Sequence, residues 1–125
     1  MKRETFYIGK KCGTIAIVVN DGGGVLSCCG EEMEVLKPNT VDAAAEKHVP
    51  VIAIDGDVVT VTVGEVEHPM VEDHWIEWIY LVTKQGVQAK CLNPGDAPCA
   101  KFILADDEII AAYAYCNKHG LWRSE

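Results

Sequence analysis

In this chain of 125 residues, four histidines and one cysteine are the side chains best suited to metal binding or catalysis. The stretch AYCNKHGLW, residues 114 to 122, places Cys116 and His119 three positions apart, so that both side chains can reach one site from a single turn. A cysteine and a histidine at this spacing fit a metal site, a catalytic pair or two unrelated neighbours. The stretch alone leaves all three readings open.

The other three histidines lie in polar or turn contexts at the margins of predicted strands: His48 in EKHVP, His68 in EHPM and His74 in EDHWIEW. A single histidine of this kind is usually a surface or structural residue. His68 and His74 flank one loop, however, so only three chain segments must meet to join all four rings to Cys116. Four imidazoles and one thiolate exceed the four ligands of a closed structural zinc site. They suit a metal such as iron with an open sixth position, where an electron-rich thiolate favours chemistry on a small oxidant.

The composition excludes several classes of protein. Acidic residues number 19 against 11 basic ones, and the formal net charge of -8 argues against a nucleic-acid partner. No apolar run is long enough to cross a bilayer, and the charged start MKRETFYIGK is followed by no apolar stretch that could serve as a signal sequence. We therefore expect a cytoplasmic protein without membrane association. In a reducing compartment, its six cysteines are more typical of metal ligands or plain thiols than of disulfides.

The chain is predicted to have two unequal parts. Residues 1–36 contain two short apolar runs around the glycine-rich reversal NDGGG, which predicts a β-hairpin. This segment is too small to fold by hydrophobic burial alone, so a metal or a partner chain should support it. The following stretch KPNTVDAAAEKHVP predicts a linker and a short helical turn that ends before Pro50.

From Val51 onward the hydrophobic pattern has period two. The predicted strands are VIAID, GDVVTVTVGEV, HWIEWIYLVTK, a short strand after TKQG, and two runs around the acidic turn of CAKFILADDEIIAAYAYC. Several short strands separated by turns, with little helical periodicity, predict an antiparallel β-sandwich.

Five motifs in order along the chain resemble those of the superoxide reductases, the desulfoferrodoxin and neelaredoxin family. They are EKHVPVI at 46–52, VGEVEHPM at 63–70, HWIEWI at 74–79, PGDAP at 94–98 and YCNKHGLW at 115–122. The resemblance covers nearly the whole chain. It implies an all-β fold, with an immunoglobulin-like antiparallel β-sandwich over residues 37–125 that holds iron. A small desulforedoxin-like β-hairpin domain over residues 1–36 would precede it.

The resemblance also implies roles for individual residues. One mononuclear, non-haem iron, cycling between Fe(2+) and Fe(3+), would be held by His48, His68, His74 and His119, with Cys116 as the axial ligand. Lys47 matches the lysine that attracts superoxide and helps to supply a proton. Glu46 matches the carboxylate that binds the resting ferric iron and leaves on reduction. The implied reaction is the one-electron reduction of superoxide to hydrogen peroxide, with electrons from rubredoxin or a similar carrier.

The N-terminal segment departs from the family pattern. Two-iron members carry four cysteines there, and this chain matches them at Cys12, Cys28 and Cys29 but has Gly9 at the position of the first. Three thiolates do not close a tetrahedral site. We therefore expect the segment to keep its fold without a second metal. The alternative is a weak three-cysteine site completed by an outside ligand or water, with zinc as a candidate.

Other functions remain as alternatives. A non-catalytic iron protein that only transfers electrons would not need Glu46 and Lys47, and a structural zinc protein would not need five donors. An activity like that of superoxide dismutase is the nearest rival. Cys91 and Cys99 match no ligand position and are interpreted as ordinary thiols. Because the first segment buries little by itself, we expect a homodimer or a homotetramer, as in family members.

Overall fold

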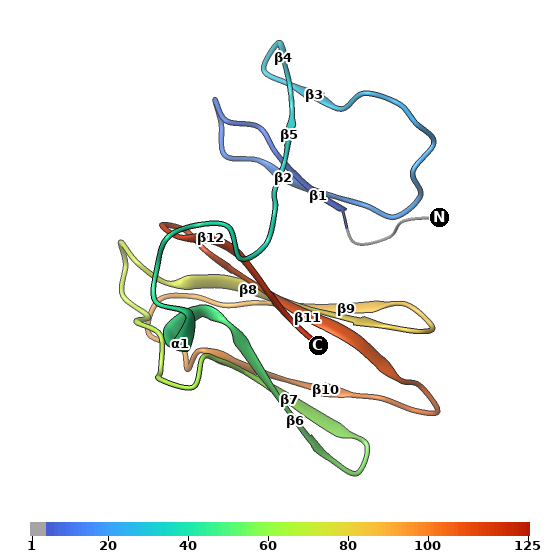
Figure 1. Cartoon of the computed structure of the whole chain (residues 1–125), viewed down its shortest axis with the longest axis vertical. Helices are drawn as coiled ribbons and strands as arrows, with labels where there is room; N and C mark the ends of the chain where they lie inside the picture. The colour runs from blue at the N-terminus through green and yellow to red at the C-terminus, as the bar shows by residue number, and fades with distance from the viewer. Residues whose placement is uncertain (1–4) are drawn as a thin grey trace. The chain divides into compact units, whose positions relative to one another are not determined.

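The computed structural model describes residues 5–125, which form two compact units that divide between Lys37 and Pro38 (Figure 1). Each unit has its own sheets and its own buried side chains. No helix in the described part of the chain is long and apolar enough to cross a membrane.

The described residues of the first unit form five short strands. They are β1 (Thr5–Ile8), β2 (Ile15–Val18), β3 (Ser27–Cys28), β4 (Glu31–Glu32) and β5 (Glu34–Val35). One sheet has the order β2-β1-β5, and β3 and β4 form a separate hairpin. The predicted hairpin around NDGGG is wrong, because the runs on either side of it belong to different sheets: β2 pairs with β1 across residues 9–14, and NDGGG at 20–24 leads from β2 to β3, which pairs with β4. Among the large apolar side chains of this unit that the structure describes, only Phe6 and Met33 are buried, so hydrophobic burial contributes little to its stability.

The second unit is an antiparallel β-sandwich. One sheet has the order β10-β7-β6 and the other has the order β12-β11-β8-β9 (Figure 1). The strands are β6 (Pro50–Asp55), β7 (Val58–Val63), β8 (Ile76–Thr83), β9 (Val87–Cys91), β10 (Cys99–Ile103), β11 (Ile109–Cys116) and β12 (Gly120–Ser124). The antiparallel sandwich predicted from the period-two pattern is thereby confirmed.

The sandwich core follows directly from the residue pattern. In β7, Val59, Val61 and Val63 are buried and alternate with more exposed residues, as expected for a strand with one face on the core. The central strands β8 and β11 are buried along most of their length, because both lie inside a sheet and face the opposite one. This core provides the rigid frame at whose end the histidines lie.

Helix α1 (Ala45–His48) is a single turn that ends before Pro50, as the sequence predicts. It lies against the end of β7 because Gly64 has no side chain. A Cβ atom at Gly64 would stand 2.7 Å from the carbonyl oxygen of Glu46 and 2.9 Å from the carbonyl carbon of Lys47. The N–H of Val66 donates to the same Glu46 oxygen at 2.8 Å and fixes this contact.

Candidate metal centre

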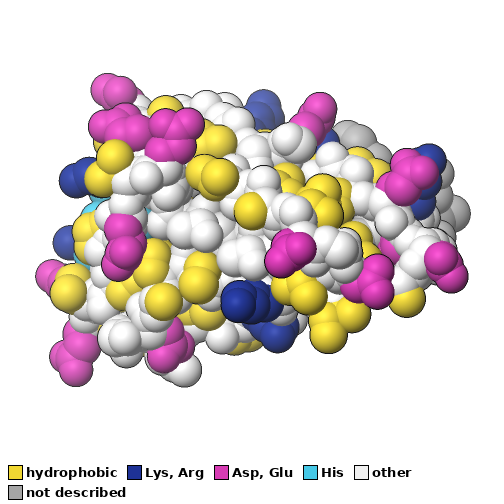
Figure 2. Space-filling model, turned by 90° about the horizontal axis from the view of Figure 1, so that it is seen from below, with side chains coloured by type: hydrophobic (Ala, Val, Ile, Leu, Met, Phe, Trp, Pro, Cys, Tyr) yellow, Lys and Arg dark blue, Asp and Glu magenta, His cyan; other side chains and the backbone are white. Residues whose placement is uncertain are grey.

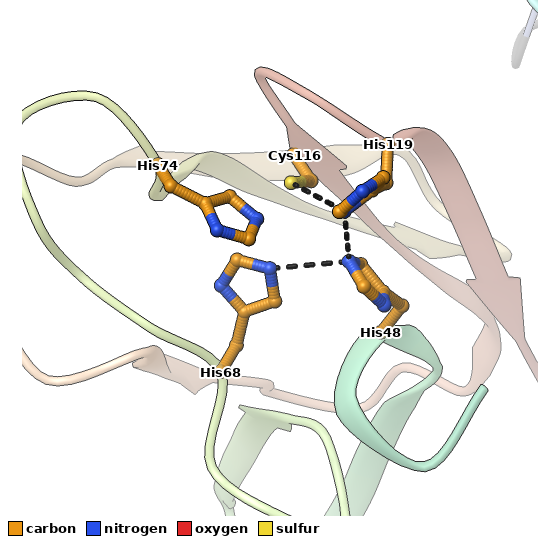
Figure 3. Close-up of side chains that lie close together, drawn as sticks. All are labelled: His48, His68, His74, Cys116 and His119. Atoms are coloured by element: carbon orange, nitrogen blue, oxygen red, sulfur yellow. Dashed lines mark hydrogen bonds between the residues drawn. The ribbon is translucent and has the colours of Figure 1, made fainter. Parts of the chain in front are cut away.

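Five donor side chains converge at one end of the sandwich (Figure 3). His48 is the last residue of α1, His68 lies in the loop after β7, and His74 lies just before β8. Cys116 ends β11, and His119 stands in the turn to β12. One ligand atom from each residue lies within 4.8 Å of all the others. The structure therefore brings together all five residues that the sequence and the resemblance singled out.

Backbone carbonyls fix the orientation of two of the rings. Nδ1 of His48 donates to the carbonyl oxygen of Ala44 at 2.7 Å, and Nδ1 of His68 donates to that of Pro69 at 2.6 Å. In a neutral imidazole with a protonated Nδ1, the Nε2 atom carries a lone pair. Both Nε2 atoms point into the cluster, 3.2 Å from each other.

Burial keeps these two rings uncharged. Loss of hydration lowers the pKa of His68 to about 4 and also lowers the pKa of His48, and in both cases the carbonyl bond opposes the effect only in part. At neutral pH both rings are therefore neutral, and no proton stands between the two Nε2 atoms. Two lone pairs that face each other at this distance repel unless a cation lies between the rings. The donor chemistry of the site thus fits a metal ion.

The other three donors, His74, His119 and Cys116, are also placed as metal ligands would be. Nε2 of His74 is buried and has no hydrogen-bond partner among the described residues, an arrangement that costs about 1–3 kcal/mol in the absence of a ligand. Nδ1 of His119 lies 3.1 Å from Nε2 of His48 and 3.9 Å from Sγ of Cys116. Burial raises the pKa of the fully buried Cys116 thiol, so metal binding there would have to displace a proton.

Asn117 connects two of the segments that carry donors. Its side-chain NH2 donates to the carbonyl oxygen of Asp73 at 3.0 Å, and its side-chain oxygen accepts from the N–H of Trp75 at 3.0 Å. These two contacts lie on either side of His74, while Asn117 itself follows Cys116. The asparagine thereby fixes the loop of His74 against the β11–β12 turn.

Trp122 contacts two of the five donor residues, His48 and His119. Its ring stacks on the ring of His48 with a centroid distance of 4.9 Å and an interplanar angle of 28°. Its indole N–H donates to the backbone carbonyl of His119 at 3.0 Å. Sequence reasoning quoted Asn117 and Trp122 within motifs but gave them no role, because their contacts appear only when β11, β12 and the His74 loop are assembled.

Several exposed charged side chains neighbour the five donors in the sequence. Glu46 and Lys47 are exposed on α1, immediately before His48. Lys118 is also exposed and forms a loose ion pair with Asp73 at 3.9 Å. In Figure 2, histidine side chains are visible at the surface with basic side chains close by. Exposed basic side chains thus lie near the histidines, although the formal net charge of the chain is -8.

The three N-terminal cysteines form a second cluster. Sγ of Cys12 lies 3.1 Å from Sγ of Cys28, which lies 3.9 Å from Sγ of Cys29. A Cβ atom at Gly9 would be within 3.3 Å of two of these sulfurs. The glycine therefore faces the cluster, as expected for the position at which two-iron family members carry their first cysteine. Cys91 and Cys99 lie in β9 and β10 and belong to neither cluster.

Comparison with protein families identifies the class of protein. The family model for desulfoferrodoxin matches residues 40–125, and the model for the desulfoferrodoxin N-terminal domain matches residues 3–36. The chain belongs to the desulfoferrodoxin family. The resemblance drawn from the five motifs is confirmed.

Individual relatives agree with this assignment. A desulfoferrodoxin from Nitratidesulfovibrio vulgaris is 52% identical over 114 residues, which cover 91% of this chain and 90% of that protein. A superoxide reductase from Pyrococcus horikoshii is 37% identical over 102 residues, covering 67% of this chain and 89% of that protein. The crystal structure of the superoxide reductase from Treponema pallidum matches with a TM-score of 0.84 and 36% identity, covering 99% of this chain and all of that one. The predicted fold class, a β-sandwich preceded by a small β domain, is confirmed.

Proposed function

We propose that this protein is a superoxide reductase that converts superoxide to hydrogen peroxide by one-electron reduction. The observation that carries the proposal is the convergence of five donors. Among them, the unprotonated Nε2 atoms of His48 and His68 face each other at 3.2 Å. An iron ion held by His48, His68, His74, His119 and Cys116 would supply the electron and, as a Lewis acid, stabilise the product. Membership of the family and the similarity to named superoxide reductases support iron as the metal.

The residues around the cluster have separable tasks. The carbonyl bonds of His48 and His68 hold their rings with Nε2 turned inward, which preserves the donor geometry through the catalytic cycle. Lys47 attracts the superoxide anion to the exposed face and, with water, delivers a proton to the reduced product. Glu46 would offer a carboxylate oxygen to the oxidised ion. Cys116 would supply an anionic sulfur that raises electron density at the ion.

We further propose that the electrons come from rubredoxin or a similar small carrier, and that the chain acts as a homodimer or homotetramer. His74 and His119 are only partly buried, so the edge of the centre reaches the surface at one end of the sandwich, which supports direct transfer from a soluble donor.

The deciding experiment counts electrons. Iron-loaded full-length protein is given superoxide and reduced rubredoxin without oxygen-scavenging enzymes, and donor oxidation and dioxygen are measured together. A reductase consumes one donor electron for each superoxide and releases no dioxygen. Dioxygen release without donor oxidation would identify a dismutase instead, and donor oxidation that is independent of superoxide would identify a simple electron carrier.

A further inference from the structure

The cysteines of the first unit form a cluster that the proposed reaction does not use. Cys12 follows β1, Cys28 ends β3, and Cys29 begins the turn to β4. Their sulfurs lie within 4.8 Å of one another, although the three residues come from two separate loops. Among the described residues, this is the one group of potential metal ligands outside the histidine centre. Soft thiolate donors gathered in this way select soft ions.

The backbone at Cys29 points to a role for its thiol. Cys28 pairs with Glu31 across the hairpin, so Cys29 and Gly30 form a two-residue turn. Both have positive φ values, +53° and +76°, as in a type I′ turn. Asn and Gly favour the first position of this turn, whereas a cysteine there adopts the left-handed conformation at a cost in stability. A thiol in this strained position faces two other thiols.

The Cys12 loop also orients its sulfur toward the cluster. The carbonyl oxygen of Gly9 accepts from the N–H of Gly13 at 2.7 Å and from that of Cys12 at 3.3 Å, which closes the loop tightly. The N–H of Thr14 is directed at Sγ of Cys12 at 3.5 Å. A backbone N–H directed at sulfur stabilises a thiolate over a thiol.

The fourth side of the cluster is closed by Gly9. This residue is buried, and a Cβ atom there would lie 3.1 Å from Sγ of Cys28 and 3.3 Å from Sγ of Cys12. Glycine offers no side-chain ligand atom, so the position from which a side chain would face the sulfurs supplies no donor. Structural zinc normally requires four protein ligands, whereas copper(I), a soft ion with a filled d shell, is satisfied by three thiolates.

We propose that Cys12, Cys28 and Cys29 form a three-thiolate site for a soft monovalent cation, with copper(I) as the ion that fits it best. The site uses no residue of the histidine centre and does not depend on the superoxide chemistry. It develops the alternative of a three-cysteine site raised from the sequence rather than the expectation of no second metal, because the three sulfurs lie within 4.8 Å of one another. Binding is an exchange of thiol protons for the ion, with no change in the oxidation state of copper or sulfur.

The test uses the full chain, reduced and free of oxygen, with its histidine centre already loaded with iron. Copper(I) is supplied from its complex with the chelator bicinchoninate, and transfer to the protein is followed by loss of the chelator colour and gain of ultraviolet thiolate–copper absorption. We expect one equivalent of copper(I) per chain in addition to iron. Zinc, supplied against a chelator of its own, should bind more weakly.

The decisive variant is Cys29→Asn. Asparagine suits the first position of the type I′ turn better than cysteine does, so this variant should keep or increase the thermal stability of the first unit while it loses the copper(I) equivalent. Cys91→Ser removes an exposed thiol of the second unit and should change neither property. The proposal is wrong if Cys29→Asn still binds copper(I), if the parent chain binds none, or if zinc competes successfully for the three sulfurs.

Discussion

The two cysteine-containing clusters differ in what holds their donors in place. The five donors of the second unit extend from the end of a packed sandwich, and hydrogen bonds from the backbone and from Asn117 and Trp122 fix them. The three thiols of the first unit lie on short loops beside a core of two large buried side chains. A rigid frame can hold ligands in the one geometry that an ion with five or six ligands requires. Short loops hold ligands less precisely and suit an ion that accepts a low coordination number. Four substitutions test this contrast.

The largest effect should come from Cys116→Ser in the second unit. A serine oxygen is a poor substitute for a thiolate, so the visible thiolate-to-iron absorption of the oxidised protein should disappear, together with reduction of superoxide. The measurement is a visible spectrum with metal analysis. Cys99→Ser removes a partly buried thiol of the same unit outside the cluster and should leave the spectrum unchanged. An unaltered spectrum in Cys116→Ser would remove this residue from the ligand set.

Gly64→Ala tests whether the frame, rather than the ligands alone, makes the site. The added methyl group meets the backbone of Glu46 and Lys47, which cannot move aside as a flexible side chain would. We expect a loss of about 1–3 kcal/mol in the free energy of unfolding, and lower iron content because α1 carries His48. Gly86→Ala, where nothing lies within 4 Å of the added atom, is the matched control in denaturant titrations. Equal behaviour of the two variants would contradict the close-packing argument.

Asn117→Ala should have an intermediate effect on metal affinity. Both hydrogen bonds around His74 are lost, and loss of such supporting contacts typically weakens metal binding by about 10- to 100-fold. Chelator competition measures the change. Asn39 makes a similar pair of bonds to the backbone of Arg123, away from the five donors. Asn39→Ala should therefore lower stability without changing iron affinity, and a similar loss of affinity in both variants would show that Asn117 acts only on the fold.

Lys47→Ile should have the smallest effect and leave the metal site intact. Loss of one positive charge beside the centre should slow the bimolecular reaction with superoxide by about tenfold and weaken its dependence on ionic strength. Rapid-mixing or pulse-radiolysis kinetics at two salt concentrations measure both effects. Lys101→Ile removes an exposed charge from β10 in the same unit and controls for net charge. Identical rates for the two variants would exclude local steering by Lys47.

The strands of the β-sandwich could be predicted from the sequence where buried and exposed residues alternate regularly. The alternation of β7 is visible in its valines, and the expected strands VIAID and HWIEWIYLVTK correspond to β6 and β8 with ends that differ by one or two residues. Strand ends are set by loop contacts such as the bridge between Val71 and His74, which no local pattern encodes. The candidate ligands could be found because their residue types are rare in this chain and occur in recognisable motifs.

The supporting residues could not be found in the same way. Asn117 and Trp122 act through contacts to segments distant in sequence, and Gly64 matters because of a helix that packs against it from an earlier segment. Nothing in their neighbouring residues indicates these partners. Similarly, the left-handed backbone at Cys29 is a property of the β3–β4 pairing, which the short and exposed strands barely indicate in the sequence.

The five donors of the second unit come from segments that span most of its chain, from α1 near its beginning to the turn before its last strand. An ion bound to all of them is therefore a cross-link that closes several loops at once. Such a cross-link restricts the unfolded chain as well as completing the folded one. The metal should consequently make the β-sandwich unfold more slowly and more cooperatively. The centre would then stabilise the same domain whose fold positions its ligands.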